Sequence, residues 1–320
     1  MYELQFFDNN GCMKRFKNIL FVVNGDAVSD QALKLALSLA MQNQADLSFM
    51  VLHPAFPQEL ENAKGLYEKA IKEDIKSKLK ENGLVEDSHI FFESSSPHFV
   101  AVIQQVIRND FDLVIKAAES LGDEGTQDKG FKSLDMSLLR KCPCPVWLCR
   151  VFYNNETPRV LTAIDPVSET PEGRDLNLNL LQTGDFLAKN LGGIHDVISC
   201  WDFEEEGFLR HSAFLNMEAE KVDALVIEAE QEHRLEVEKC LEKAGIDRPN
   251  TIICQRGEAY KIIPEYVQDH QIDRVVMGTV ARTGIPGFII GNTAENILQN
   301  LSCGLFAIKP NGFVSPIKAY

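Results

Sequence analysis

The chain has 320 residues, of which 45% are hydrophobic and 25% are charged, and its formal net charge is −15. These proportions are those of an ordinary globular protein and exclude a fibrous or low-complexity chain. The acidic balance excludes binding of nucleic acid through a generally basic surface. We expect neither a membrane span nor a signal peptide, because no apolar run has the required length or flanks, and we therefore expect a cytoplasmic protein.

Short apolar runs alternate with helical patterns, and the order is the same in both halves of the chain. The runs expected to form strands are residues 17–23, 46–52, 89–92, 112–115 and 145–148, then 159–165, 194–201, 251–254, 273–276 and 305–308. The longer helices between them are expected at residues 32–41, 59–81, 176–191 and 208–243. This alternation predicts βαβ units with a parallel sheet in each half. We expect a tail over residues 1–15 and two domains over residues 16–153 and 154–320.

The stretch at residues 277–298 is the most informative motif. A predicted strand ends in a loop with Gly278, Gly284, Gly287 and Gly291, and a helix is expected to begin at Asn292. Asn292 and Glu295 have the spacing of a capping box. Glycines allow the backbone to approach a ligand closely, and a helix N-terminus favours an anion such as phosphate. The loop lacks the Gly-Lys-Ser/Thr of a P-loop and the dinucleotide fingerprint, so it predicts a phosphate site of another kind. The alternative is a loop that serves folding alone.

This motif and its surroundings resemble the universal stress protein family in its tandem-domain form. The family signature is Gly, two residues, Gly, nine residues, Gly, and then Ser or Thr. Gly278 and Gly291 occupy the first and third positions, while Ala281 and Asn292 stand at the second and fourth. The run from Leu138 to Trp147 in the first half and the run Gly-Asn-Thr-Ala-Glu from Gly291 carry the rest of the resemblance, which covers nearly the whole chain.

The resemblance implies an α/β fold of two tandem five-stranded parallel sheets with helices on both faces, related to the adenine-nucleotide alpha-hydrolases and packed as an intrachain pseudo-dimer. It also implies a cytoplasmic stress-response protein of bacterial type that binds ATP or another adenine nucleotide, with Mg. The nucleotide-binding residues that it implies are Asp165, Pro166, Met277, Gly278, Ala281, Arg282, Gly291, Asn292 and Thr293. An Asp before a Pro also begins a turn, which is the alternative reading of Asp165.

The first half departs from the signature and is expected to have a degenerate site. Asn24 stands where the second half has Asp165, and the paired glycines before the helix are missing. Asp135 lies near that helix start, where it would repel phosphate while capping the helix. We therefore expect nucleotide binding in the second half and none in the first.

Other functions remain open at the level of sequence. A larger amphipathic or lipid-like ligand could bind in a cleft between the halves, lined by Phe208, Leu209, Phe214 and Leu215. Slow hydrolysis of ATP is the enzymatic alternative, although no catalytic base is placed to activate water. The expected partner is a small molecule. The expected assembly is a monomer with an internal pseudo-two-fold axis, with a homodimer of such chains as the alternative.

Metal and thiol sites are less well supported. His195, Cys200, Asp202 and His211 are weak candidates for a zinc site, but their spacing fits no standard closed site, so we expect no metal. Eight cysteines occur without a CxxC motif, which indicates free buried thiols in a reducing compartment. Cys142-Pro143-Cys144 is the exception, because its two thiols lie close enough for a redox switch or a soft-metal site.

Overall fold

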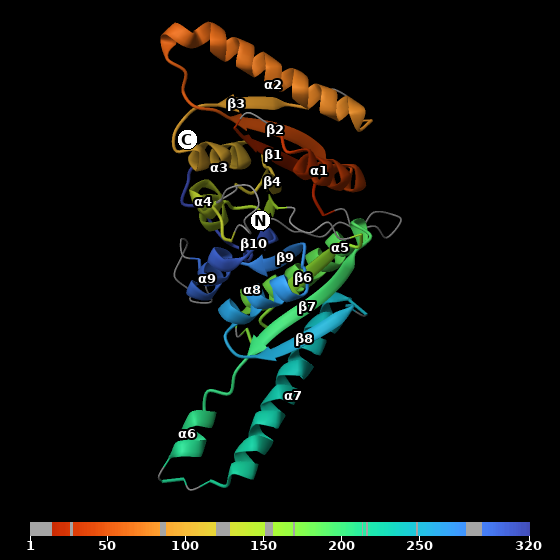
Figure 1. Cartoon of the computed structure of the whole chain (residues 1–320), viewed down its shortest axis with the longest axis vertical. Helices are drawn as coiled ribbons and strands as arrows, with labels where there is room; N and C mark the ends of the chain where they lie inside the picture. The colour runs from red at the N-terminus through yellow and green to blue at the C-terminus, as the bar shows by residue number, and fades with distance from the viewer. Residues whose placement is uncertain are drawn as a thin grey trace.

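The computed structural model describes residues 15–25, 28–83, 88–119, 129–150, 156–168, 170–212, 214–215, 217–247, 249–279 and 290–320. Strands and helices alternate along both halves of the chain (Figure 1). In the first half these are β1 (Asn18–Asn24), α1 (Asp30–Asn43), β2 (Asp46–Leu52), the 3-10 turn η1 (Gln58–Leu60), α2 (Glu61–Glu81), β3 (Ile90–Glu93), α3 (His98–Arg108), β4 (Leu113–Ala117), α4 (Ser133–Lys141) and β5 (Val146–Cys149). In the second half they are β6 (Arg159–Ala163), α5 (Pro171–Asn190), β7 (Ile194–Trp201), α6 (Glu206–His211), α7 (Ala219–Ala244), β8 (Thr251–Arg256), α8 (Ala259–Asp269), β9 (Arg274–Gly278), α9 (Asn292–Asn300) and β10 (Gly304–Ile308).

The strands of both halves form one continuous sheet in the order β3-β2-β1-β4-β5-β10-β9-β6-β7-β8. Pairing is parallel within each half and antiparallel where β5 meets β10. Counted outward from this joint, the order is β5-β4-β1-β2-β3 in the first half and β10-β9-β6-β7-β8 in the second, so equivalent strands hold equivalent places. The predicted α/β fold, with two five-stranded parallel sheets packed as an intrachain pseudo-dimer, is confirmed. None of the helices in the described ranges is long and apolar enough to cross a membrane.

The joint between the halves is a packed core. Trp147 pairs with Phe306 across the two strands, and each holds the same place in its own half, so the pseudo-two-fold axis passes between them. Their ring centroids are 5.7 Å apart, and Phe16 packs against Phe306 at 6.0 Å. Hydrophobic clusters on both faces of the sheet contain residues from both halves. The two halves are therefore joined through a shared interior.

Helix boundaries differ most from the predictions in two places. The helix expected at residues 176–191 begins earlier, at Pro171, because the Thr170 hydroxyl accepts a hydrogen bond from the Gly173 N–H at 3.1 Å and Pro171 suits the first helical turn. The single helix expected at residues 208–243 is wrong, since the structure divides it into α6 and α7. Ser212 ends α6, and its hydroxyl accepts from the Phe214 N–H at 3.4 Å, a local bond that competes with the helix.

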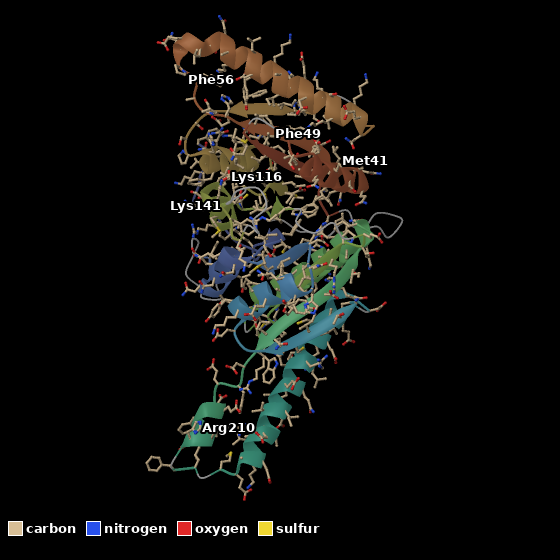
Figure 2. The ribbon with its side chains drawn as sticks, viewed as in Figure 1. Met41, Phe49, Phe56, Lys116, Lys141 and Arg210 are labelled. Carbon is tan, nitrogen blue, oxygen red and sulfur yellow. The ribbon has the colours of Figure 1, made fainter. Side chains whose placement is uncertain are left out.

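The arm formed by α6 and α7 extends beyond the sheet at the end of the molecule farthest from the joint (Figure 1). Arg210 marks this tip in Figure 2. Phe208 and Phe214, which were expected to line a cleft between the halves, lie on this arm and are exposed, Phe214 to 97%. That placement was wrong, because Leu209 and Leu215 belong to the same distal arm and the halves meet through paired strands.

Candidate functional site

The second half contains a pocket of about 680 Å³ at the carboxyl ends of its strands. In an open α/β sheet this is the edge at which ligands bind. The pocket lies where β6, β7 and β9 end and where α8 and α9 begin. Its lining includes Asp165, Leu176, Asn177, Leu180, Ile198, Trp201, Asp202, Glu204, Glu258, Ile263, Met277, Gly278, Gly291, Asn292, Thr293, Ala294 and Ile297.

Six residues of the predicted nucleotide site meet in this pocket. Asp165 enters from the end of β6, Met277 and Gly278 from the end of β9, and Gly291, Asn292 and Thr293 from the start of α9. Pro166 is buried next to Asp165 and is not part of the lining. Ala281 and Arg282 lie outside the described residues. The structure thus brings together side chains that are more than 100 residues apart in the sequence.

The backbone of Asp165 is held by a side chain that the sequence did not single out. Asn177 of α5 accepts a hydrogen bond from the Asp165 N–H at 3.2 Å and donates to the Asp165 carbonyl at 2.6 Å. Asn177 is only 4% exposed, so this clamp is shielded from water. The sequence feature that could have indicated this role is a polar residue on an otherwise apolar helix face, because a buried polar group requires hydrogen-bond partners. Asn177 therefore fixes the end of β6 at the rim of the pocket.

The N-terminus of α9 opens into the pocket. Gly291 is its N-cap residue, and among the described residues no side chain caps the helix. The predicted capping box is wrong, because the Glu295 carboxylate pairs with the Arg140 guanidinium of the first half. The first-turn N–H groups and the helix dipole therefore favour a negative group here. Gly291 has φ −60°, which any residue adopts, so a small residue is useful here for close approach and not for backbone strain.

The side chains of the pocket carry negative charge. Asp165, Asp202, Glu204 and Glu258 line it, whereas the described lining residues include no Lys or Arg. Asp202 is paired with Arg256 at 3.2 Å. Positive potential in the described part of the pocket therefore comes from the helix starts and not from basic side chains. Apolar side chains such as Leu180, Ile198 and Ile297 form the remaining walls.

The equivalent place in the first half is filled by the protein's own charges. The N-caps of α4 and α9 are Lys132 and Gly291, and the same offset places Asp135 where the second half has Ala294. The pairing of β4 and β9 with β1 and β6 likewise places Lys116 where the second half has Met277. The first half therefore has a lysine in place of Met277 and an aspartate in place of Ala294.

Lys116 and Asp135 form an ion pair in the interior of the first half, where Figure 2 shows Lys116. The Lys116 Nζ lies 2.9 Å from an Asp135 carboxylate oxygen and 3.5 Å from Glu119, and it donates to the Ala117 carbonyl at 2.9 Å. The other Asp135 oxygen accepts from the Glu119 N–H at 3.0 Å. Asp135 was expected to cap α4, but α4 has no side-chain cap in the described structure, because the buried lysine attracts this carboxylate. The sequence feature that could have indicated this ion pair was a lysine inside the apolar run of β4.

The weak zinc candidates do not come together. His195 lies near the start of β7, and Cys200 and Asp202 lie at its other end, which a strand rise of about 3.3 Å per residue places more than about 15 Å away. His211 ends α6 on the distal arm. The described residues contain no group of three or more His, Cys, Asp or Glu side chains that could hold a metal ion. Instead, the His195 Nε2 lies 2.8 Å from the Thr162 hydroxyl in the interior.

The buried imidazole of His195 makes a pH-dependent contribution to stability. Burial lowers the pKa of His195 to about 4, although Asp185 and Asp196 oppose this change. An unfolded histidine titrates near 6.5, so the unfolded chain binds the extra proton between these two values. The stabilisation is therefore complete above about pH 6.5 and is lost as the pH falls towards 4, by about 3 kcal/mol in total.

We expect His195→Gln to reduce this dependence of the unfolding free energy on pH. Chemical denaturation at a series of pH values between about 7 and 4 would measure it. His211→Gln is the matched control, because His211 is exposed and the substitution should leave the profile of the wild type unchanged. Parallel profiles for the wild type and His195→Gln would contradict the assignment.

Comparisons with known proteins agree with this architecture. The sequence profile of the universal stress protein family matches residues 15–150 and again residues 157–309. The universal stress protein E homolog of Haemophilus influenzae is 31% identical over 70% of this chain and 70% of its own length. Universal stress protein E of Escherichia coli K12 is 30% identical over 69% of this chain and 67% of its own length.

Solved structures show the same fold over nearly the whole chain. A functionally unknown protein from Pseudomonas aeruginosa PAO1 has a TM-score of 0.70 at 23% identity, with 93% of this chain and 94% of that chain covered. A universal stress protein from Archaeoglobus fulgidus has a TM-score of 0.55 at 15% identity, with 91% and 98% covered. Two successive family matches, relatives at about 30% identity and the paired sheets lead to one assignment: the chain belongs to the universal stress protein family.

Proposed function

We propose that this chain is a cytoplasmic stress-response protein that acts by binding one adenine nucleotide in the second-half pocket. The observation that carries the proposal is the pocket itself, in which Asp165 and the open N-terminus of α9 face a shared space of about 680 Å³. In this proposal Asp165 accepts a hydrogen bond from the base, and the first turn of α9 receives the phosphates. This pocket volume lies within the range of roughly 300–1,000 Å³ that is typical of small-molecule sites.

The chemistry of the residues is compatible with a nucleotide that carries a divalent cation. The phosphates would meet backbone N–H groups at α9, where the lining residues Gly291, Thr293 and Ala294 are small. Mg²⁺ bound to the phosphates would offset the carboxylates of Asp202 and Glu258, because this ion prefers carboxylate, water and phosphate oxygens. The role proposed for the protein is recognition, with nucleotide occupancy altering its shape or its partners.

We expect Ala294→Asp to abolish this binding, because it installs the carboxylate that the first half has at the equivalent place. A carboxylate about 4 Å from a phosphate charge costs roughly 4 kcal/mol at an effective dielectric of 20, and a loss of more than about tenfold in affinity needs only 1.4 kcal/mol. Calorimetric titration with MgATP would compare the variant with the wild type.

Asn300→Asp is the control for the Ala294→Asp experiment, since it adds the same charge at the opposite end of the same helix, away from the pocket. It should retain the affinity of the wild type. Equal affinities for the wild type and Ala294→Asp would place the phosphates elsewhere. If the wild type binds no adenine nucleotide, the proposed function itself is wrong.

A further inference from the structure

A pair of buried thiols lies on the first-half side of the joint, outside the nucleotide pocket. Cys142 follows the last turn of α4 and Cys144 precedes β5, with Pro143 between them. Their sulfur atoms are 3.6 Å apart, within the distance of a hydrogen bond between thiols. Cys142 is completely buried, and Cys144 retains a small exposed edge.

The second half contributes a buried lysine to this pair. Lys309 follows β10, and the antiparallel pairing of β10 with β5 brings it to the end of the sheet where Cys144 lies. Its Nζ lies 5.0 Å from the centre of the Phe313 ring, and no ion pair with a carboxylate is formed by Lys309 in the described ranges. Its charge lowers the pKa of both thiols, while the carboxylate of Asp112 opposes this effect at Cys144. Burial lowers the pKa of Lys309, and Cys142 and Cys144 oppose this shift, so the joint places a buried lysine amine beside two thiols.

The surroundings shift the pKa values of the two thiols in opposite directions. Burial raises the pKa of Cys142, but the hydrogen bond from the Cys144 thiol and the charge of Lys309 outweigh burial, so the net pKa is lowered. Burial and the neighbouring Cys142 raise the pKa of Cys144 well above its usual value. Burial also raises the pKa of Cys303, the equivalent residue of Cys144 in the second half, to about 12. A thiol of lowered pKa next to a second thiol is the arrangement of an attacking and a resolving cysteine.

We propose that Cys142, Cys144 and Lys309 form a peroxide-sensitive site, in which hydrogen peroxide converts the two thiols into a disulfide. The Cys142 thiolate sulfur attacks one peroxide oxygen, breaks the O–O bond and becomes a sulfenic acid, and the hydroxide released takes up a proton as water. The Cys144 sulfur then attacks the Cys142 sulfur, forms the S–S bond and expels the hydroxyl, which leaves with the Cys144 proton as a second water. Two thiols and one peroxide give one disulfide and two waters, and both electrons go to the peroxide.

The geometry limits both the oxidant and the structural change. Cys144 is 7% exposed and Cys142 is completely buried, so we expect a small uncharged oxidant to reach the pair and a bulky disulfide such as oxidised glutathione to be excluded. The sulfur atoms must approach from 3.6 Å to a bond length of about 2.05 Å, which moves the end of α4 towards β5. Oxidation also removes both ionisable thiols beside Lys309. The change therefore occurs where the two halves meet.

The test uses the reduced full-length protein, treated with hydrogen peroxide, unfolded, alkylated and digested with trypsin. The tryptic peptide of residues 142–150 contains Cys142, Cys144 and Cys149. We expect it to lose the mass of two hydrogen atoms, to carry the alkyl label on Cys149 alone, and to regain two labels after treatment with dithiothreitol. Peptide mapping is needed because the chain has eight cysteines, and the disulfide must be assigned to one pair. Cys303→Ser is the matched control and should form the same disulfide at the same rate.

Lys309 is tested through the rate of this oxidation. Lys309→Met should slow disulfide formation by about tenfold or more, because the thiolate loses its counter-charge, and Lys309→Arg should restore most of the rate. Circular dichroism would check that both variants fold. The absence of a disulfide in the 142–150 peptide, or equal rates for all three Lys309 forms, would overturn the proposal. Tight binding of one Ag⁺ by the thiol pair in a protein that resists peroxide would also overturn it, in favour of a soft-metal site.

Discussion

Replacing Asp135 with alanine is expected to lower the free energy of unfolding by about 3 kcal/mol. Lys116 is 1% exposed, and removal of its 2.9 Å partner leaves a buried ammonium group. Glu119 at 3.5 Å remains, which places the effect at the lower end of the 3–5 kcal/mol typical of a broken buried pair. Equilibrium denaturation of the full chain, followed by circular dichroism, would measure the loss.

The double substitution Lys116→Met with Asp135→Ala tests the reason for this loss. It introduces the residues that the second half has at these places, Met277 and Ala294, and removes both charges together. Since apolar replacement of a buried ion pair is often neutral, the double variant should recover to within about 1 kcal/mol of the wild type. A double variant as unstable as Asp135→Ala alone would show that packing, and not an unpaired charge, explains the single effect.

Trp147→Ala is expected to lower the free energy of unfolding by about 3–5 kcal/mol and to loosen both sides of the joint. Trp147 is 2% exposed and pairs with Phe306 on the pseudo-two-fold axis. Truncation would leave a cavity shared by the two halves, and the core around Phe306 would lose a large contact surface. Amide hydrogen exchange should therefore rise in β10 as well as in β5.

Phe49→Ala is the matched control for the joint. Phe49, labelled in Figure 2, is also completely buried. It lies on β2, which is separated from β5 by β1 and β4. Its truncation should cost a similar free energy while exchange in β10 stays close to that of the wild type. Faster exchange in β10 for Phe49→Ala, or unchanged exchange there for Trp147→Ala, would contradict the claim that Trp147 couples the halves.

The sequence predicted the fold well because local patterns and global packing agree. Short apolar runs such as Leu20 to Val23 favour strands of a covered sheet, and their repetition in the second half indicated two similar domains. The split between α6 and α7 was missed because the apolar period continues across it, whereas the break depends on local hydrogen bonds of Ser212.

The candidate site was only partly predictable. The glycine spacing and the position of Asp165 identified the pocket, since strand ends and a helix start meet at one edge of a parallel sheet. The roles of Asn177 and Lys116 depend on partners that the fold brings beside them, Asp165 at a sequence separation of 12 and Asp135 at a separation of 19. The Arg140–Glu295 pair crosses the joint between the halves, and no local pattern indicates such a contact.

Covalent labelling with a photoreactive azido-adenine nucleotide tests the central claim most directly. We expect one label per chain, located in peptides of the second half that border the pocket near Asp165 or the start of α9, and protection by excess ATP. The first half should remain unlabelled, because Lys116 and Asp135 already fill its equivalent site. Two labels per chain, or a label in the first half that ATP prevents, would contradict the account.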